Sequence, residues 1–455
     1  MAGGIWTSQN KTLPGVYINV KSQGNVNANV GTRGVVAIAE PLSWGPTGVV
    51  QEITPGESLV PYIGYDVTQP QALFLREMMK GSNFTSGPIS ILLYRPTGTS
   101  GAAATGKIGA LTVTALYVGV RGNDVSIIIS EEVDNEGTYD VQTVVDGSIV
   151  DDQAITDLSQ LVANSWVSFS GTGTTITETA GQTLTGGVDP IVATTDYSTF
   201  LQAMEPYTFD VIAYDGTEQT VIQAYAAFAE RVSDSIGKKC QAVAAGQYAI
   251  AADSEYMIGV QNGVALDDGT TLTPQQAVWW VAGAEAGALY YQSLTYAAYP
   301  NAVSASPKLT ESELTEAVQS GALCFIDDFG AAQVCTDINT LTTYTVDKGE
   351  EFHKNRVMRV LMQFCNDVYR YFSQSFIGKV DNNDTGRNLL KGWIVGYLNG
   401  MQANNGVQNF TAEDVEVLPG SEVDAVVINV SIQPVDSVEK IYMTVTVSVN
   451  VETEA

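Results

Sequence analysis

The sequence predicts a multidomain α/β protein with an α/β core, an inserted mostly-β domain and a C-terminal α+β domain. The chain has 455 residues, whereas a single hydrophobic core usually serves fewer than about 300. Buried strands and helices alternate over most of it, but residues 105–195 contain short alternating strands instead. We therefore divide the chain into residues 1–33, 34–104, 105–195, 196–350 and 351–455.

The first segment, residues 1–33, is predicted to form an N-terminal arm and a linker. A short alternating strand over residues 14–21 stands ahead of any core and has no hairpin partner nearby in the sequence. Residues 23–33 follow it and are rich in Gly and Asn, which is typical of a linker.

The α/β core occupies residues 34–104 and 196–350. Its first part contains buried strands at 35–39 and 89–94, with a helix over 69–79 between them. The elements expected in its second part are helix 197–204, strand 210–214, helix 218–236, strand 240–245 and helix 274–298. This alternation predicts one α/β layer that the insert interrupts.

The insert, residues 105–195, is dense in Thr, Gly and Asp and carries 12 acidic residues against Lys107 and Arg121. Strands are expected at 111–118, 125–129 and 139–145, separated by clusters of turn residues, with a helix at 156–165. The pattern predicts a domain of mostly β structure.

The last segment, residues 351–455, begins with a reversal of charge and ends in strands. Seven basic residues between 351 and 401 are set against four acidic ones. Two stripes share its first helix: apolar Val357, Leu361, Phe364, Val368 and Phe372, and polar Arg356, Arg359, Gln363 and Arg370. A basic stripe in so acidic a chain favours an acidic partner, and a solvated face is the alternative. Strands are expected at 426–433 and 440–449.

Charge and hydropathy exclude several classes of function. A net charge of −29 repels nucleic acid and anionic membrane surfaces, so neither is expected as a partner. The longest apolar helix candidate, residues 277–291, carries Glu285 and is shorter than the ~20 residues that span a bilayer. The amino terminus lacks the basic and apolar regions of a secretory signal, so we expect a protein that is made and assembled in the cytoplasm.

The reactive side chains predict no enzyme, no cofactor and no metal site. His353 is the only histidine, and the four cysteines lack CxxC spacing. Residues 101–107 spell a phosphate-binding loop but precede a strand, so a flexible linker is expected there. Residues 381–386 imitate a calcium loop, but Gly392 stands where a carboxylate is needed, so a helix cap is expected. An acidic glycoside hydrolase with an unlocated carboxylate pair is the enzymatic alternative.

The two terminal strands, 14–21 and 440–449, favour assembly into a polymer. Unpaired strands expose backbone N–H and C=O groups to uncontrolled pairing. Donating each strand to a neighbouring subunit satisfies these groups, and head-to-tail links that do not close form helical filaments. Pairing within the subunit is the alternative. A surface-layer or pilus-like filament protein would also use donated strands.

Five segments resemble contractile phage tail sheath proteins, most closely those of defective prophages and phage-tail-like bacteriocins of Gram-positive bacteria. They are GGIWTSQNKTLPGVYI (3–18), RGVVAIAEPLSWG (33–45), RGND (121–124), FDVIAY (209–214) and VINVSIQPVDSVEKIY (427–442). The resemblance runs over most of the chain, its two ends are its most specific part, and residues 130–190 carry little of it.

The resemblance implies a structural subunit of a sheath that stacks in six-membered rings around an inner tube. The sheath contracts on a baseplate signal and drives the tube through the target envelope, with energy stored in the extended lattice. Implied partners are other copies of the chain, the inner tube protein, the baseplate and the tail terminator. The particle, a phage tail or a bacteriocin, would assemble in the bacterial cytoplasm and leave on lysis. The insert could instead be a glycan or receptor module.

The resemblance also assigns two sets of residues. The inter-subunit arm strands contain Val16, Tyr17, Ile18, Val20, Ile441, Tyr442, Val445, Val447 and Val449. Residues 351–455 would face the tube, with a basic face made of Lys354, Arg356, Arg359, Arg370, Arg387 and Lys391.

Overall fold

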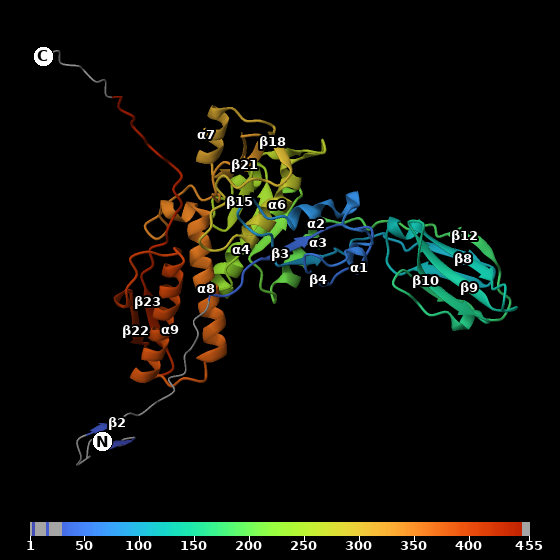
Figure 1. Cartoon of the computed structure of the whole chain (residues 1–455), viewed down its shortest axis with the longest axis horizontal. Helices are drawn as coiled ribbons and strands as arrows, with labels where there is room; N and C mark the ends of the chain where they lie inside the picture. The colour runs from blue at the N-terminus through green and yellow to red at the C-terminus, as the bar shows by residue number, and fades with distance from the viewer. Residues whose placement is uncertain (1, 5–14, 18–29, 448–455) are drawn as a thin grey trace. The chain divides into compact units, whose positions relative to one another are not determined.

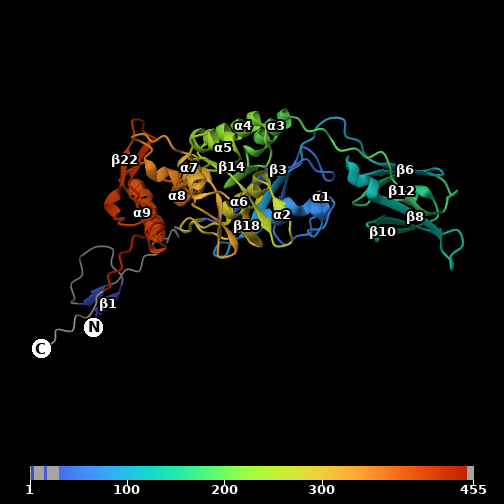
Figure 2. The same ribbon diagram turned by 90° about the horizontal axis from the view of Figure 1, so that it is seen from above.

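The computed structural model describes residues 2–4, 15–17 and 30–447, drawn in Figure 1 and Figure 2. The chain divides into two compact units. The larger unit consists of Gly31–Gln374 and Pro434–Ala455, and the smaller of Met1–Val30 and Ser375–Gln433, each within the described residues.

A seven-stranded sheet forms the centre of the larger unit. Its strands, in spatial order, are β19 (Ala322–Leu323), β15 (Met257–Val260), β14 (Gln241–Ala245), β13 (Val211–Tyr214), β3 (Val35–Ala39), β5 (Ser90–Tyr94) and β4 (Val50–Ile53). Neighbouring strands run parallel, except that β4 pairs antiparallel with β5 at the edge. Runs of Val, Ile, Leu and Ala make these inner strands fully buried, as a parallel sheet covered on both faces requires.

Helices cover both faces of the sheet. The helices α2 (Leu73–Met78) and α6 (Pro274–Gly287) pack in the core of one face. The core of the other face contains side chains from α3 (Thr194–Met204), α4 (Gln219–Arg231), α5 (Gln247–Ile250) and the first half of α8 (Asn355–Ser375). Gly283 lets α6 approach α2 closely, because a Cβ atom there would lie 1.9 Å from the Met78 carbonyl oxygen.

Short elements complete the layer around the sheet. They are the helical turns α1 (Val60–Ile63), η1 (Pro70–Ala72), η4 (Val232–Ile236), α7 (Glu311–Gln319) and η5 (Glu350–His353), and the strands β16 (Gly263–Leu266), β17 (Thr271–Leu272), β18 (Ala302–Ser306), β20 (Phe325–Asp328) and β21 (Ala331–Val334). Strands β17, β16 and β18 form one small sheet, and β20 pairs with β21 in a hairpin.

The insert is a β-sandwich with its own core. One sheet contains β10 (Ser148–Ile155), β9 (Tyr139–Val145), β8 (Val125–Glu131) and β12 (Thr179–Thr183), and the other contains β11 (Val167–Ser170), β7 (Leu111–Ala115) and β6 (Thr105–Ile108). Alternate side chains of β7 and β8 point into the core, which Trp44 joins by packing against Trp166 at 4.7 Å between ring centroids.

Two predictions for the insert are wrong. The helix expected at 156–165 is a single turn, η3 (Leu158–Gln160), because the backbone becomes extended at Leu161 and the Val162 N–H donates to the Gln153 side chain at 2.9 Å. The expected flexible linker at 101–107 runs instead into β6, where Gly106 and Lys107 pair with Val113 and Thr112 of β7.

The smaller unit contains two β-pairs and one long helix. Its elements are β1 (Ala2–Gly4), β2 (Gly15–Tyr17), α9 (Asp384–Ala403), η6 (Ala412–Asp414), β22 (Val415–Pro419) and β23 (Val426–Val430). β22 and β23 form an antiparallel hairpin, and α9 packs on β22. The expected cap at 381–386 is confirmed, since the Asn383 side chain accepts a bond from the Gly386 N–H at 2.9 Å.

The predicted strand at 14–21 has a nearby partner after all. β2 pairs in parallel with β1, so that Ala2 lies opposite Gly15 and Gly4 opposite Tyr17. The pairing is parallel and involves no hairpin, whereas the sequence pattern indicated only that a hairpin partner is absent. Residues 14 and 18–21 lie outside the described part of the chain.

The core elements that the sequence predicts are present, except for the end of α6, whereas strands β4, β15 and β19 of the central sheet were not predicted. Periodicity predicted a helix to residue 298, but α6 ends at Gly287. Beyond Gly287 the backbone bonds to β21. The Tyr296 N–H donates to the Val334 carbonyl at 2.8 Å, and the Val334 N–H donates to the Ala297 carbonyl at 3.0 Å. Pairing with a distant strand replaces the helical bonds there.

Candidate functional site

The helix α8 buries a polar stripe that differs from the predicted one, and it buries little of its predicted apolar stripe. Asn355, Arg359, Gln363 and Asp367 follow each other at intervals of four residues, and all are between 0 and 5% exposed. Of the predicted apolar stripe, Val357 is buried, whereas the other members are half-buried. The prediction that Arg359 lies on an exposed basic face is therefore wrong.

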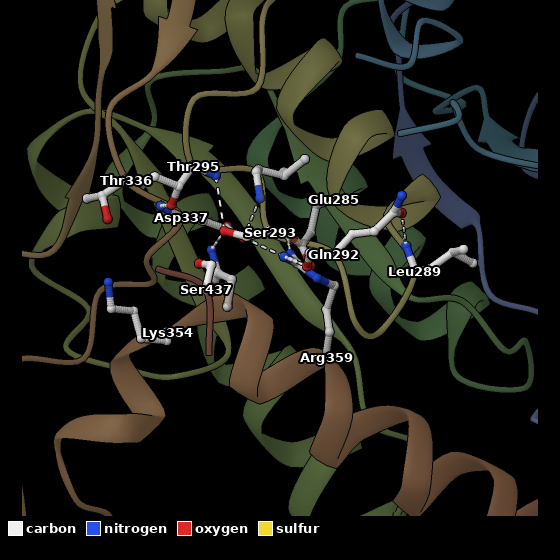
Figure 3. Close-up of polar contacts among 12 residues, drawn as sticks. Glu285, Leu289, Gln292, Ser293, Thr295, Thr336, Asp337, Lys354, Arg359 and Ser437 are labelled. Atoms are coloured by element: carbon white, nitrogen blue, oxygen red, sulfur yellow. Dashed lines mark hydrogen bonds and ion pairs between the residues drawn. The ribbon is translucent and has the colours of Figure 1, made fainter. Parts of the chain in front are cut away.

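Arg359 is the centre of a buried cluster of charges (Figure 3). Its guanidinium forms ion pairs with Glu285 of α6 and with Asp337, and donates to the Gln292 carbonyl at 2.8 Å. Asp337 also accepts bonds from the Leu294 N–H at 2.8 Å and the Asn355 side chain at 3.0 Å. A charge without water needs such partners, so the cluster ties α6, α8 and the segment between β21 and α8 together.

Burial shifts the protonation of this cluster. It raises the pKa of the Glu285 carboxyl to about 7, while attraction from Arg359 acts in the opposite direction. Burial also acts to lower the pKa of Arg359, but Asp337 and Glu285 more than offset that, so this pKa is raised. Its two carboxylate partners therefore favour the charged form of Arg359.

The chain enters the core through contacts with α8 and the end of α6. The Gly31 N–H donates to the Asp367 carboxylate at 2.7 Å, and the Gly34 N–H donates to Asp210 at 2.7 Å. Arg33 donates to the backbone carbonyls of Glu285 and Ala286 at 2.9 and 3.2 Å, and its guanidinium lies 3.6 Å from the Glu285 carboxylate. We call residues 31–34 the N-terminal root.

The chain leaves the core through contacts made by Glu439. Its carboxylate accepts bonds from Thr295 at 2.7 Å and Thr336 at 3.3 Å, and pairs with Lys354. Thr295 in turn accepts a bond from the Asp337 N–H at 2.9 Å. We call residues 434–439 the C-terminal root. Polar contacts therefore run unbroken from the N-terminal root, through Glu285, Arg359 and Asp337, to the C-terminal root.

Residues 440–447 follow the C-terminal root without a strand partner in the described part of the chain. Four of the predicted arm residues lie here and are almost fully exposed, namely Ile441 (80%), Tyr442 (92%), Val445 (75%) and Val447 (82%). Of the others, Val16 and Tyr17 lie in β2, and Ile18, Val20 and Val449 lie outside the described residues. Their role between subunits stays a prediction.

The other predicted basic residues occupy separate places. Lys354 pairs with Glu439, Arg356 is half-buried, and Arg370 is half-exposed and pairs with Asp367 at 2.7 Å. In the smaller unit, Arg387 pairs with Asp384 in the first turn of α9, which also carries Lys391. Whether any of these residues meets a tube stays a prediction.

The single histidine and the possible metal ligands were the remaining candidates for chemistry. Burial lowers the pKa of His353, which lies in η5 immediately before α8. Residues 2–4, 15–17 and 30–447 contain no group of three His, Cys, Asp or Glu side chains placed to hold a metal ion. Over the same ranges no helix is long and apolar enough to cross a membrane.

Family profiles match four successive parts of the chain. The phage tail sheath protein central domain matches residues 192–340, the phage tail sheath C-terminal domain 347–448, and the phage tail sheath β-sandwich domain 99–189. The domain III N-terminal region of the tail sheath protein Gp18 matches residues 33–85. Each match falls on a part of the fold described above.

Full-length relatives agree with these profiles. The phage-like element PBSX protein XkdK of Bacillus subtilis is 34% identical, and the alignment covers 98% of this chain and 100% of that protein. The chain belongs to the phage tail sheath protein family. The crystal structure of the sheath tail protein of Desulfitobacterium hafniense is 42% identical, with a TM-score of 0.84 over 96% of this chain and 100% of that one. That of Listeria innocua is 33% identical, with a TM-score of 0.76 over 92% and 95%.

A more distant likeness concerns the fold alone. The contracted helical sheath of the anti-feeding prophage is 14% identical, with a TM-score of 0.56 over 96% of this chain and 99% of that one. The family is structural and non-enzymatic, which agrees with the prediction that the chain is not an enzyme. The chain is thus a phage tail sheath protein.

The sequence pattern did not predict the buried cluster, although one signal pointed to it. Glu285 is the one acidic residue in an otherwise apolar helix, and a carboxylate in such a place requires a buried partner. An arginine at interior helical spacing, Arg359, could have been paired with it. Asp337, Thr295 and Glu439 lie in irregular segments, where spacing carries no such signal.

Proposed function

We propose that this sheath protein polymerises in stacked six-membered rings around an inner tube and contracts to drive the tube through a target cell envelope. Neighbouring subunits are joined by strands donated from the two ends of the chain. The particle is a phage tail or a bacteriocin, assembled in the bacterial cytoplasm and released on lysis, and residues 351–455 face its tube.

The main support for this proposal is that residues 440–447 are exposed and lack a strand partner within the described residues. They alternate polar and apolar side chains, yet within the described residues they pair with no strand. Leaving five large apolar side chains and the backbone of an extended segment in water is costly in an isolated subunit. A second chain that pairs with the segment removes that cost.

The hairpin of β22 and β23 offers a suitable acceptor in a neighbouring subunit. It has only two strands, so one edge of each strand is unpaired within the described residues. Leu418 and Val427 on these strands are 40% and 46% exposed. Strand addition at these edges supplies main-chain hydrogen bonds and covers both side chains.

Two truncations test the proposal. Removal of residues 440–455 leaves Glu439 and the C-terminal root intact, and removal of residues 1–22 leaves the N-terminal root intact. Each truncated chain is expected to stay folded by circular dichroism and monomeric by light scattering. The full chain is expected to form tubes in negative-stain micrographs under the same conditions.

A matched control removes only residues 452–455, which lie beyond the predicted strand, and is expected to polymerise. Normal tubes from either long truncation would overturn donation of that strand. Monomers from the full chain at every salt concentration, with the tube protein present, would overturn the sheath assembly itself.

A further inference from the structure

The strand order of the central sheet reverses between β3 and β13. From β3 the chain continues to β5 on one side, and after the insert it crosses to β13 on the other side. Open α/β sheets bind ligands outside the carboxyl ends of their strands at such a point. Glu40 is the first residue after β3, and Asp215 is the first residue after β13.

The Glu40 carboxyl is buried and incompletely bonded. The residue is 8% exposed, and its Oε1 atom has no hydrogen-bond partner among the described residues. Asp215 lies beside it and accepts a bond from the Trp279 indole N–H at 2.8 Å. A buried polar atom without a partner is costly, so this orphan oxygen marks a place where a donor is missing.

A cavity of about 320 Å³ opens beside Glu40. Its walls come from the segment after β3 and from α1, α2 and α6, and include Leu42, Ile63, Tyr65, Phe74 and Trp279. The space is at the lower end of the range for small-molecule pockets. It therefore suits a small group with an apolar stem and one polar end.

The side chains that line the cavity indicate which charge the bound group should carry. The Glu40 carboxyl in the wall, with Asp215 beside it, disfavours an anion, and a divalent metal ion requires more oxygen ligands than these residues supply. Aromatic faces and a carboxylate together attract ammonium and guanidinium groups. We propose that this cavity binds an alkylammonium or guanidinium group, held by Glu40.

Binding is coupled to one proton. Burial, and then the nearby Asp215, raise the pKa of Glu40 well above its usual range. The other titratable groups that face it, Tyr197 of α3 and Tyr225 of α4, have raised pKa values and are neutral at pH 7. The entering cation favours the ionised carboxylate, so the Glu40 proton passes to solvent as the ion pair forms. Affinity therefore increases with pH.

Titration of the purified, unpolymerised chain with n-butylammonium and agmatine tests the site. Calorimetry in two buffers of different ionisation enthalpy is expected to show one saturable site and proton release. The neutral analogue n-butanol should bind at least about tenfold more weakly, a difference of about 1.4 kcal/mol. Salt at about 0.15 M suppresses diffuse attraction to the acidic surface.

Variants at the site and away from it complete the test. Glu40→Gln is expected to weaken amine binding about tenfold or more, whereas Glu52→Gln, at an exposed carboxyl of β4, should leave it unchanged. Equal binding of n-butanol, unchanged binding by Glu40→Gln, or no saturable heat with either amine would overturn the proposal.

A lysine-containing peptide separates the two sources of the cation. Binding of the peptide together with the free amines indicates a side chain of a partner polypeptide, and binding of the free amines alone indicates a small amine. Because the assay uses unpolymerised protein, its result is independent of the proposed sheath assembly.

Discussion

Arg359 of α8 and Asp337 form an ion pair in which both side chains are excluded from solvent. Arg359 also pairs with Glu285 of α6, whose backbone carbonyl accepts a bond from Arg33 of the N-terminal root. On the other side, the Asp337 N–H bonds to Thr295, which donates to Glu439 of the C-terminal root. The two segments that we propose to join subunits are thus anchored to one buried cluster.

Replacing Arg359 with Met should strongly destabilise the larger unit. The change keeps a long side chain but leaves Glu285 and Asp337 buried without their common partner, a loss of about 3–5 kcal/mol. Urea unfolding followed by tryptophan fluorescence measures it. Arg231→Met is the matched control, because the Arg231–Glu205 pair is nearly half-exposed on both sides and contributes about 1 kcal/mol or less. Equal losses in the two variants would contradict a special role for the buried pair.

The elements of the α/β core could be predicted because their side chains carry the signal locally. Strand β3 is a continuous apolar run bounded by polar residues, and its predicted limits match the structure. The end of α6 could not be predicted in this way. It depends on hydrogen bonds of Tyr296 and Ala297 with Val334, which lies on a strand far along the chain. Hydrophobic periodicity reflects only residues close in sequence, so it cannot reveal pairing with a distant strand.

The faces of α8 were assigned incorrectly for a related reason. Charge at helical spacing normally indicates a solvated face, and Arg359 and Gln363 fit that rule in the sequence. Their burial follows from Glu285, Asp337 and the N-terminal root, none of which is near them in sequence. A polar stripe can be recognised as buried only when the residues that pair with it elsewhere in the chain are known.

Glu439→Gln should loosen the C-terminal root without unfolding the larger unit. The amide cannot pair with Lys354, and bonds to a charged acceptor contribute about 1.5–3 kcal/mol. Cleavage after the exposed Lys440 requires the residues before it to leave the core, so trypsin should cut there several-fold faster. Glu422→Gln, an exposed carboxyl in the smaller unit, is the control. An unchanged cleavage rate would show that Glu439 does not hold the root.

Lys391→Glu tests the proposed contact with an acidic tube. Lys391 lies on α9 and its substitution disturbs no ion pair among those found in the structure. If α9 faces the tube, reversing this charge should reduce co-sedimentation with tubes several-fold at low salt and less at high salt. Lys107→Glu, at an exposed side chain of β6 that forms no ion pair among those found in the structure, is the control for a general change of charge. The same reduction in both variants would argue against a contact at α9.

The Glu40 carboxyl should make stability depend on pH even without a ligand. Burial, followed by Asp215, raises its pKa in the folded chain, so the folded state holds the proton more tightly than the unfolded state does. The resulting stabilisation is complete below the ordinary pKa of about 4.5 and is lost as the pH rises toward the raised value. Glu40→Gln removes this titration. We therefore expect the unfolding free energy of the native chain to fall more than that of the variant between pH 5 and about 9. Urea midpoints at both pH values measure the difference, and parallel losses would mean that Glu40 is already ionised in the folded protein.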